Sequence, residues 1–273
     1  MVTRRRALAS LMATGGLAAT RQPARLERFF EASQGAAILL DVRSRRLVGV
    51  HAPDAARKFL APPGSTLKPF VLAALLRNGR ITEGESLVCT GRLRIGSRSL
   101  DCVHPRLDAP VRIDTALAYS CNNFAAHVAE RFAGGELARE LVRAGFHAAR
   151  PAMDLDSTRL QALGEDRILV TAAELASAYR WLALNCPPQI LAGVEGAVEF
   201  GTAQRAQVPD IKVAGKTRST RTAEGASIAW FAGWMPSRTP ETVVAVMMQG
   251  RSGGSDAAPL AGRILAAYRA GRI

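Results

Sequence analysis

Apolar and polar residues follow two different periods along the chain. Near its start, the apolar runs 37–41 and 46–50 flank a polar turn, a pattern typical of a β-hairpin. Three further runs of this kind lie in the last third of the chain, over 211–215, 228–234 and 242–248. Together they predict one antiparallel sheet of about five strands.

The middle of the chain has helical spacing instead. After the helix-breaking cluster Pro62-Pro63-Gly64, residues 65–77 are apolar almost all round, which predicts a central, buried helix. Further helices are predicted over 113–119, 123–132, 136–144 and 171–184, and a last one over 260–268. The predicted fold class is therefore α+β, with a five-stranded antiparallel sheet, flanking helices and an inserted all-helical lobe.

The first 20 residues have the features of an export signal. Residues 3–6 include three arginines and precede an apolar run over 7–19, which fits a secretory or twin-arginine signal. The alternative is a frayed N-terminal helix. We expect an export signal over 1–20, cleaved or kept as an anchor, and one domain over 21–273 in the periplasm or cell envelope.

Composition and charge narrow the class of protein. With 48% apolar and 22% charged residues among 273, the chain has the make-up of a globular domain. Its net charge of +13 raises the question of nucleic acid, but the arginines are spread out, aromatic residues are few, and no nucleic-acid-binding motif is found. We therefore expect no nucleic-acid partner; attraction to an anionic envelope polymer or membrane surface explains the same charge equally well.

Two of the four cysteines flank a predicted hairpin. Cys89 and Cys102 enclose a segment that turns at Gly96-Ser97, in a register that places Cys102 opposite Gly91 and Cys89 on the same face. Export would place both thiols in an oxidising compartment, where this register is compatible with a disulfide. The pairing of the cysteines stays open at this stage.

The remaining cysteines and the histidines give no clear sign of a ligand. Cys121 and Cys186 have the character of small buried residues. The cysteine spacing matches no zinc motif, so no metal or nucleotide cofactor is expected. The histidines are scattered and are interpreted as structural: His51, His104, His127 and His147.

Candidate chemistry begins with Ser65 and Lys68 at the start of the buried helix. Positions i and i+3 share one helical face, so the lysine amine can reach the serine hydroxyl. Desolvation of a lysine on an apolar helix favours the neutral amine, which can accept the serine proton near neutral pH. The alternative is an N-cap serine beside a lysine that extends to the surface.

Two further motifs follow along the chain. Ser120 and Asn122 lie where one predicted helix ends and the next begins; a hydroxyl there can relay a proton and an amide can bind a peptide backbone, although an N-cap uses the same residue types. Lys216 and Arg218 point to one side at the end of a predicted strand, where they can attract a carboxylate or merely charge a strand edge. Only four of the 36 basic residues are lysines, and two of these four fall in the candidate motifs.

The order S-x-x-K, S-x-N, K-T-x resembles the penicillin-binding transpeptidases, serine acyl-transferases grouped with the serine β-lactamases. The residues around the motifs are similar too, over 63–70, 120–123, 213–217 and 229–234, and the resemblance runs from about Ala36 to Tyr268. It implies a β-lactamase/transpeptidase-like fold for nearly the whole chain.

The resemblance assigns a role to each motif residue. It implies that Ser65 is the nucleophile, that Lys68 is its general base, and that Ser120 passes a proton to the leaving group. Asn122 would bind the substrate amide. The substrate would be a peptidoglycan stem peptide ending in D-Ala-D-Ala, and a β-lactam would acylate the same serine.

The third motif departs from the family. The resemblance implies that Lys216 and Thr217 hold the substrate carboxylate and that a backbone N–H near Arg218 completes an oxyanion hole. The family has glycine where this chain has Arg218. A long side chain there either obstructs the strand along which substrate lies or adds a second cation for its carboxylate.

Three functions follow from these observations. The first is an exported transpeptidase or D-Ala-D-Ala carboxypeptidase that also takes β-lactams as suicide ligands. The second is a non-catalytic module that scaffolds envelope proteins, which Arg218 favours. The third is a β-lactamase, for which the sequence offers no dedicated deacylating carboxylate, since Glu165-Asp166 lies in a transpeptidase-like loop.

Overall fold

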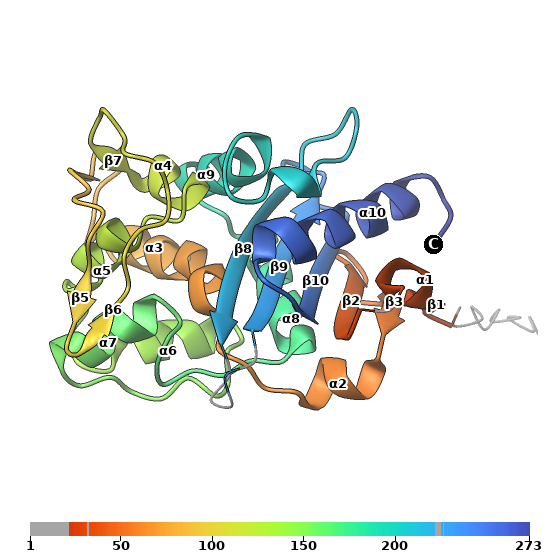
Figure 1. Ribbon diagram of the computed structural model, residues 1–273, viewed down its shortest axis with the longest axis horizontal. Coiled ribbons are helices and arrows are strands. Elements are labelled where there is room, and N and C mark those ends of the chain that lie inside the picture. Colours follow the sequence, from red (N-terminus) through yellow and green to blue (C-terminus); the bar gives the residue numbers. More distant parts are fainter. Residues whose placement is uncertain (1–21, 32, 222–224, 226) are drawn as a thin grey trace, which may run out of the picture.

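The computed structural model describes residues 22–273 except 32, 222–224 and 226, so the predicted export signal over 1–20 lies outside the described residues. Its main sheet has six strands in the order β1-β3-β2-β10-β9-β8 (Figure 1). They are β1 (Ala24–Arg25), β2 (Gly35–Asp41), β3 (Leu47–His51), β8 (Ala214–Arg221), β9 (Ser227–Met235) and β10 (Thr242–Gln249). The five predicted strands form an antiparallel sheet, and the two-residue β1 adds a parallel edge beside β3.

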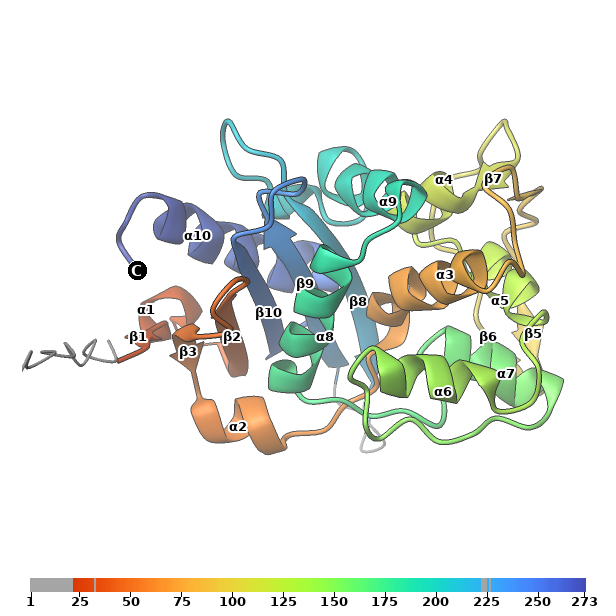
Figure 2. The same ribbon diagram turned by 180° about the vertical axis from the view of Figure 1, so that it is seen from behind.

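The central strands are buried on both faces. In β9, Trp230, Ala232 and Trp234 belong to the core on one face, whereas Phe231 belongs to the core on the other. This follows from the alternation of side chains along a strand and explains the nearly continuous apolar runs. Helix α10 (Ala258–Arg269) covers one face and α8 (Ala172–Leu184) the other, as Figures 1 and 2 show.

The inserted helical lobe is also present. Its helices are α3 (Lys68–Arg77), α4 (Ile113–Ala118), α5 (Asn122–Ala129), α6 (Glu136–Arg143), α7 (Leu155–Ala162) and α9 (Pro188–Glu199), with α8 joining it to the sheet. The predicted start of α8 is confirmed, because the Thr171 hydroxyl accepts a hydrogen bond from the Glu174 amide at 3.1 Å. The pattern missed α7 and α9, together with α1 (Glu27–Phe30) and α2 (Pro53–Lys58).

Small elements complete the lobe and the loops around it. The predicted hairpin forms from β5 (Arg94–Ile95) and β6 (Arg98–Ser99), and the Cys102 amide donates to the Gly91 carbonyl oxygen at 2.8 Å, in the predicted register. The others are the strands β4 (Ser86–Leu87) and β7 (Val111–Arg112), the 3-10 turns η1 (Gly64–Leu67) and η2 (Gln204–Ala206), and the π-turn η3 (Gly253–Ala257).

One predicted strand has the wrong bounds. The expected strand 211–215 is instead β8, which begins at Ala214 and runs through Lys216 to Arg221, paired with β9 along its length. Ile211 lies in a separate turn, where it bridges to Val208. The polar residues of β8 concealed the strand, because two of them are buried against the lobe: Lys216 and Thr217. No helix in the described part of the chain is both long and apolar enough to span a bilayer.

Candidate active site

Ser65 lies on η1, immediately before α3, and is only 3% exposed. Two glycines shape this turn. Gly64 has a φ of +52°, and its amide donates to the Gly164 carbonyl oxygen at 3.1 Å. A side chain at Gly164 would overlap the Gly64 backbone, so both positions need glycine for the loop after α7 to pack against the turn that carries Ser65.

Lys68 is the first residue of α3 and is 1% exposed. Its Nζ donates to the Ser120 carbonyl oxygen at 2.7 Å and to Asn122 Oδ1 at 2.5 Å, and lies 3.4 Å from Ser120 Oγ. Two motifs predicted from sequence therefore meet at this amine. Among the described residues, the Ser65 hydroxyl makes no hydrogen bond to Lys68, so the i,i+3 pair is adjacent without being bonded.

Burial sets the protonation of this amine. Desolvation lowers the pKa of Lys68 from its ordinary value to about 7. The nearby charge of Arg218 contributes to this lowering of the pKa, while Cys121 acts in the opposite direction. A lysine with a pKa near neutrality has a large neutral fraction, as a general base requires.

The junction between α4 and α5 presents Ser120 to Lys68 through an unusual turn. Ser120 has a φ of +61°, in the left-handed region that non-glycine residues seldom adopt. Cys121 follows as the N-cap of α5, with Sγ accepting the Phe124 amide at 3.4 Å. Asn122 Nδ2 donates to the Leu100 carbonyl oxygen at 2.9 Å, so the amide predicted to bind substrate holds the segment after β6.

The third motif forms a buried polar cluster with a residue that the sequence did not single out. Lys216 is fully buried and its Nζ donates to Thr202 Oγ1 at 3.3 Å, while Thr217 Oγ1 lies 3.0 Å from the same oxygen. Burial, reinforced by the charge of Lys68, holds the pKa of Lys216 well below its ordinary value. Thr202 comes from the turn after the unpredicted helix α9, and no local motif marks it.

Arg218 lies on the same face of the sheet as Lys216, as period 2 predicted, because their partners Trp230 and Ala232 share one core. Its side chain packs on Gly64, so that a side chain at position 64 would overlap it. The guanidinium forms an ion pair with Glu165, whose other oxygen accepts from Arg98 at 2.8 Å. The contact with Gly64 and the ion pair with Glu165 thus hold the Arg218 side chain against the turn that carries Ser65.

The cysteines are all free thiols, so the disulfide that the hairpin register allowed is not formed. Cys89 and Cys102 are nevertheless adjacent, with their sulfurs 3.7 Å apart. Cys121 lies with them, whereas Cys186 is elsewhere and half-buried. Burial raises the pKa of the Cys186 thiol to about 12, which makes it a poor nucleophile.

Comparison with known proteins supplies the family context. A family model described as the penicillin binding protein transpeptidase domain matches residues 54–199 and 188–266. Pseudomonas aeruginosa PBP2 in complex with WCK 5153 is similar with a TM-score of 0.78 and 18% identity, over 89% of this chain and 75% of that one. At this identity the similarity shows the fold alone.

A second solved structure agrees. A chain of the complex between penicillin-binding protein PBP2 and MreC from Helicobacter pylori has a TM-score of 0.76 and 16% identity, over 90% of this chain and 62% of that one. The present chain thus spans less than two thirds of that relative. None of the curated proteins compared matches the sequence.

Proposed function

Because the chain belongs to the penicillin-binding protein transpeptidase domain family, we propose that it is a serine acyl-transferase of the cell envelope that forms an acyl-enzyme on Ser65. Its natural substrate would be a peptidoglycan stem peptide, and a β-lactam would acylate the same serine. The observation that carries the proposal is the buried Lys68 amine, one helical turn from Ser65 and in contact with Ser120 and Asn122.

The chemistry follows from the positions of these groups. Neutral Lys68 accepts the Ser65 proton as Oγ attacks the substrate carbonyl carbon. The carbon–nitrogen bond then breaks, and the proton passes from Lys68 through Ser120 Oγ, 3.4 Å from Nζ, to the leaving amine. In a carboxypeptidase water releases the acyl group, whereas in a transpeptidase an amine of a second peptide releases it.

The buried polar side chains of β8 would bind the substrate. Lys216 and Thr217 belong to β8 and would hold the terminal carboxylate of the stem peptide. Burial of Lys216 disfavours its charge, and an incoming carboxylate would restore it, so binding and protonation are coupled. Export guided by residues 1–20 would bring the protein to its substrate.

The direct test uses a fluorescent penicillin on the purified chain. Intact mass gives the stoichiometry of labelling, and peptide mapping locates the adduct. We expect one stable adduct, on the peptide that contains Ser65. A chain that is heat-denatured before the penicillin is added should form no adduct. No adduct on a folded sample would contradict the proposal, and rapid nitrocefin turnover would favour a β-lactamase.

A second candidate function is a non-catalytic module that binds envelope proteins. The specific observation in its favour is Arg218, which packs on Gly64 and pairs with Glu165 beside the proposed nucleophile. One structural relative is in complex with MreC, so a protein partner of this class is the corresponding proposal. Binding of such a partner without acylation at Ser65 would support this function.

The Arg218 side chain gives the first prediction. Arg218→Gly is expected to speed acylation by penicillin about tenfold, because removing the tied side chain increases the fraction of molecules with an open site. Glu165 keeps Arg98 as a partner, so it is not left as an unpaired buried charge. The measurement is the second-order rate constant of labelling.

The matched control is Arg43→Gly, at an exposed turn. This variant should label at the wild-type rate. Slower labelling of Arg218→Gly, with its thermal unfolding unchanged, would instead assign Arg218 to substrate binding.

The pKa of Lys68 gives a pH prediction. Only the neutral amine accepts the serine proton, and burial places the pKa of Lys68 at about 7. Below that pH we expect the rate of acylation to fall about tenfold per pH unit, and above it to reach a plateau. Penicillin labelling quenched at set times, at constant ionic strength, measures this profile. A rate of acylation that is flat across neutrality, or that falls as pH rises, would exclude Lys68 as the base.

A further inference from the structure

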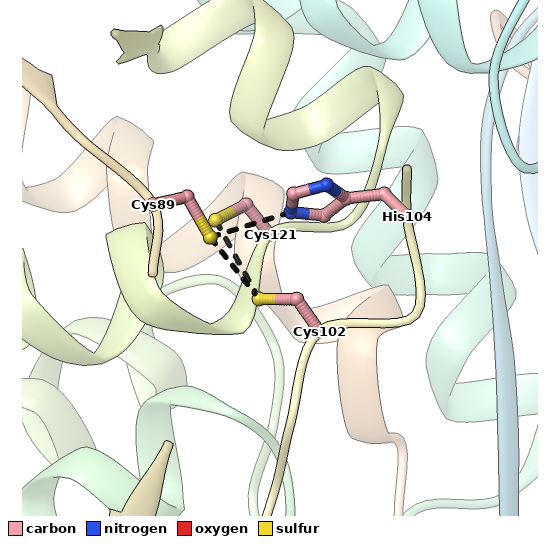
Figure 3. Close-up of side chains that lie close together, drawn as sticks. All are labelled: Cys89, Cys102, His104 and Cys121. Carbon is pink, nitrogen blue, oxygen red and sulfur yellow. Dashed lines mark hydrogen bonds between the residues drawn. The ribbon is translucent and has the colours of Figure 1, made fainter. Parts of the chain in front are cut away.

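Four side chains of types that can ligate a metal converge beside the proposed active site, in a group defined here as the cysteine-histidine cluster. Its members are Cys89, Cys102, His104 and Cys121 (Figure 3). Cys89 precedes the hairpin, Cys102 and His104 follow it, and Cys121 caps α5. Their three sulfurs and one imidazole nitrogen all lie within 4.8 Å of one another. We propose that this cluster binds one Zn²⁺ ion.

The distances between the ligand atoms fit a tetrahedral zinc site. Cys102 Sγ lies 3.7 Å from Cys89 Sγ and 3.8 Å from Cys121 Sγ. Cys89 Sγ lies 3.6 Å from His104 Nε2. Zinc bonds of about 2.3 Å to sulfur and about 2.0–2.1 Å to nitrogen, at tetrahedral angles, give edges of about 3.8 Å and 3.6 Å. Three of the six edges therefore already have the lengths of such a site, and the other three are no longer than 4.8 Å.

The surrounding hydrogen bonds prepare these atoms as ligands. His104 Nδ1 lies 2.7 Å from the Pro105 carbonyl oxygen, which can only accept, so Nδ1 carries the proton and Nε2 offers its lone pair to the cluster. Amide N–H groups donate to every sulfur of the cluster: Gly91 to Cys89, Asn122 to Cys102 and Phe124 to Cys121. Such donors stabilise thiolates, the form that binds metal.

The donor set selects the metal. Three thiolates and one imidazole in a closed tetrahedron are the ligands of structural zinc sites, with no position left for substrate. Oxygen-preferring Mg²⁺ and Ca²⁺ do not suit these ligands. A bound ion would also keep Cys89 and Cys102 reduced, because their sulfurs would share a metal rather than a bond.

The position of Cys121 links the proposed zinc site to the proposed active site. Its neighbours in the chain, Ser120 and Asn122, both accept hydrogen bonds from Lys68. Zinc would tie the strained turn at Ser120 to the segments on both sides of the hairpin. This positioning role rests on the proposed function, whereas the metal site itself does not.

Metal binding is measured without reference to activity. The purified full chain is supplied with Zn²⁺, passed over a desalting column and analysed for metal by mass spectrometry. We expect about one zinc per chain. Replacement by Co²⁺ should give the charge-transfer and d–d absorption of tetrahedral cobalt thiolate. A spectrum without the charge-transfer bands would contradict thiolate ligation.

Paired variants test the ligands. Cys89→Ser and His104→Ala should each weaken zinc binding by at least about 100-fold in competition with a chromophoric chelator. The matched controls Cys186→Ser and His127→Ala should bind as the wild type does, because neither residue belongs to the cluster. Equal zinc content in all four variants would mean an adventitious ion only and would overturn the proposal.

Alkylation of the wild-type chain covers the case in which a cluster variant does not fold. With zinc, we expect the three cluster cysteines to be protected and a chelator to expose them, with Cys186 as the internal reference. Identical alkylation in both conditions would overturn the site. A disulfide between Cys89 and Cys102 in the zinc-supplied, non-reduced protein would do so as well. Loss of zinc with penicillin labelling intact would refute only the positioning role.

Discussion

Replacement of Ser65 by alanine is expected to abolish the covalent penicillin adduct, with labelling at least about 10⁴-fold slower than in the wild type. The change removes a single oxygen from a buried turn in which the hydroxyl makes no hydrogen bond among the described residues. The fold should therefore persist while the nucleophile is lost. Intact mass after long incubation with penicillin measures the remaining adduct.

Ser97→Ala is the matched control for this variant, because Ser97 is exposed in the hairpin turn. It should label fully. An adduct that persists in Ser65→Ala, mapped to Ser120, would show that the roles of the two motif serines are exchanged. An adduct in Ser65→Ala that maps to a residue other than Ser120 would point to a nucleophile outside the three motifs.

Much of the fold could be predicted because its signals are local. The sheet strands and most helices follow from apolar periodicity, and the hairpin register followed from the turn at Gly96-Ser97. The fold class inferred from the three motifs is confirmed by the family match and the solved relatives. The predicted bounds of one strand were wrong because buried polar residues do not show the apolar pattern of a strand. The structure has β8 continuing through Lys216, whose side chain is fully buried.

The missed features of the site all depend on contacts between distant segments. Thr202 meets Thr217 only after α9 has returned the chain to β8. Arg218 pairs with Glu165 across 53 positions of sequence. For the cysteine-histidine cluster, the hairpin register predicted that Cys89 and Cys102 are adjacent, but no sequence motif indicated that His104 and Cys121 join them. Only the three-dimensional fold makes such sets visible.

Lys68→Met is expected to slow acylation of Ser65 by about 10²–10⁴-fold, the usual contribution of a positioned general base. Methionine keeps an unbranched side chain in the buried space, so the change removes the amine with little loss of packing. Asn122 Oδ1 and the Ser120 carbonyl oxygen lose their donor, and thermal unfolding is used to check that the variant folds. The rate constant of penicillin labelling is the measurement.

The pH profile separates loss of the base from displacement of Ser120. In the wild type the rate should rise with pH through about 7, the pKa of Lys68. In Lys68→Met that rise should vanish, which a merely displaced turn would not produce. Lys212→Met is the matched control, because Lys212 is 60% exposed and pairs only with Glu199 among the described residues. If Lys68→Met keeps the rise with pH, another group removes the serine proton, and the buried lysine acts through Ser120 and Asn122 alone.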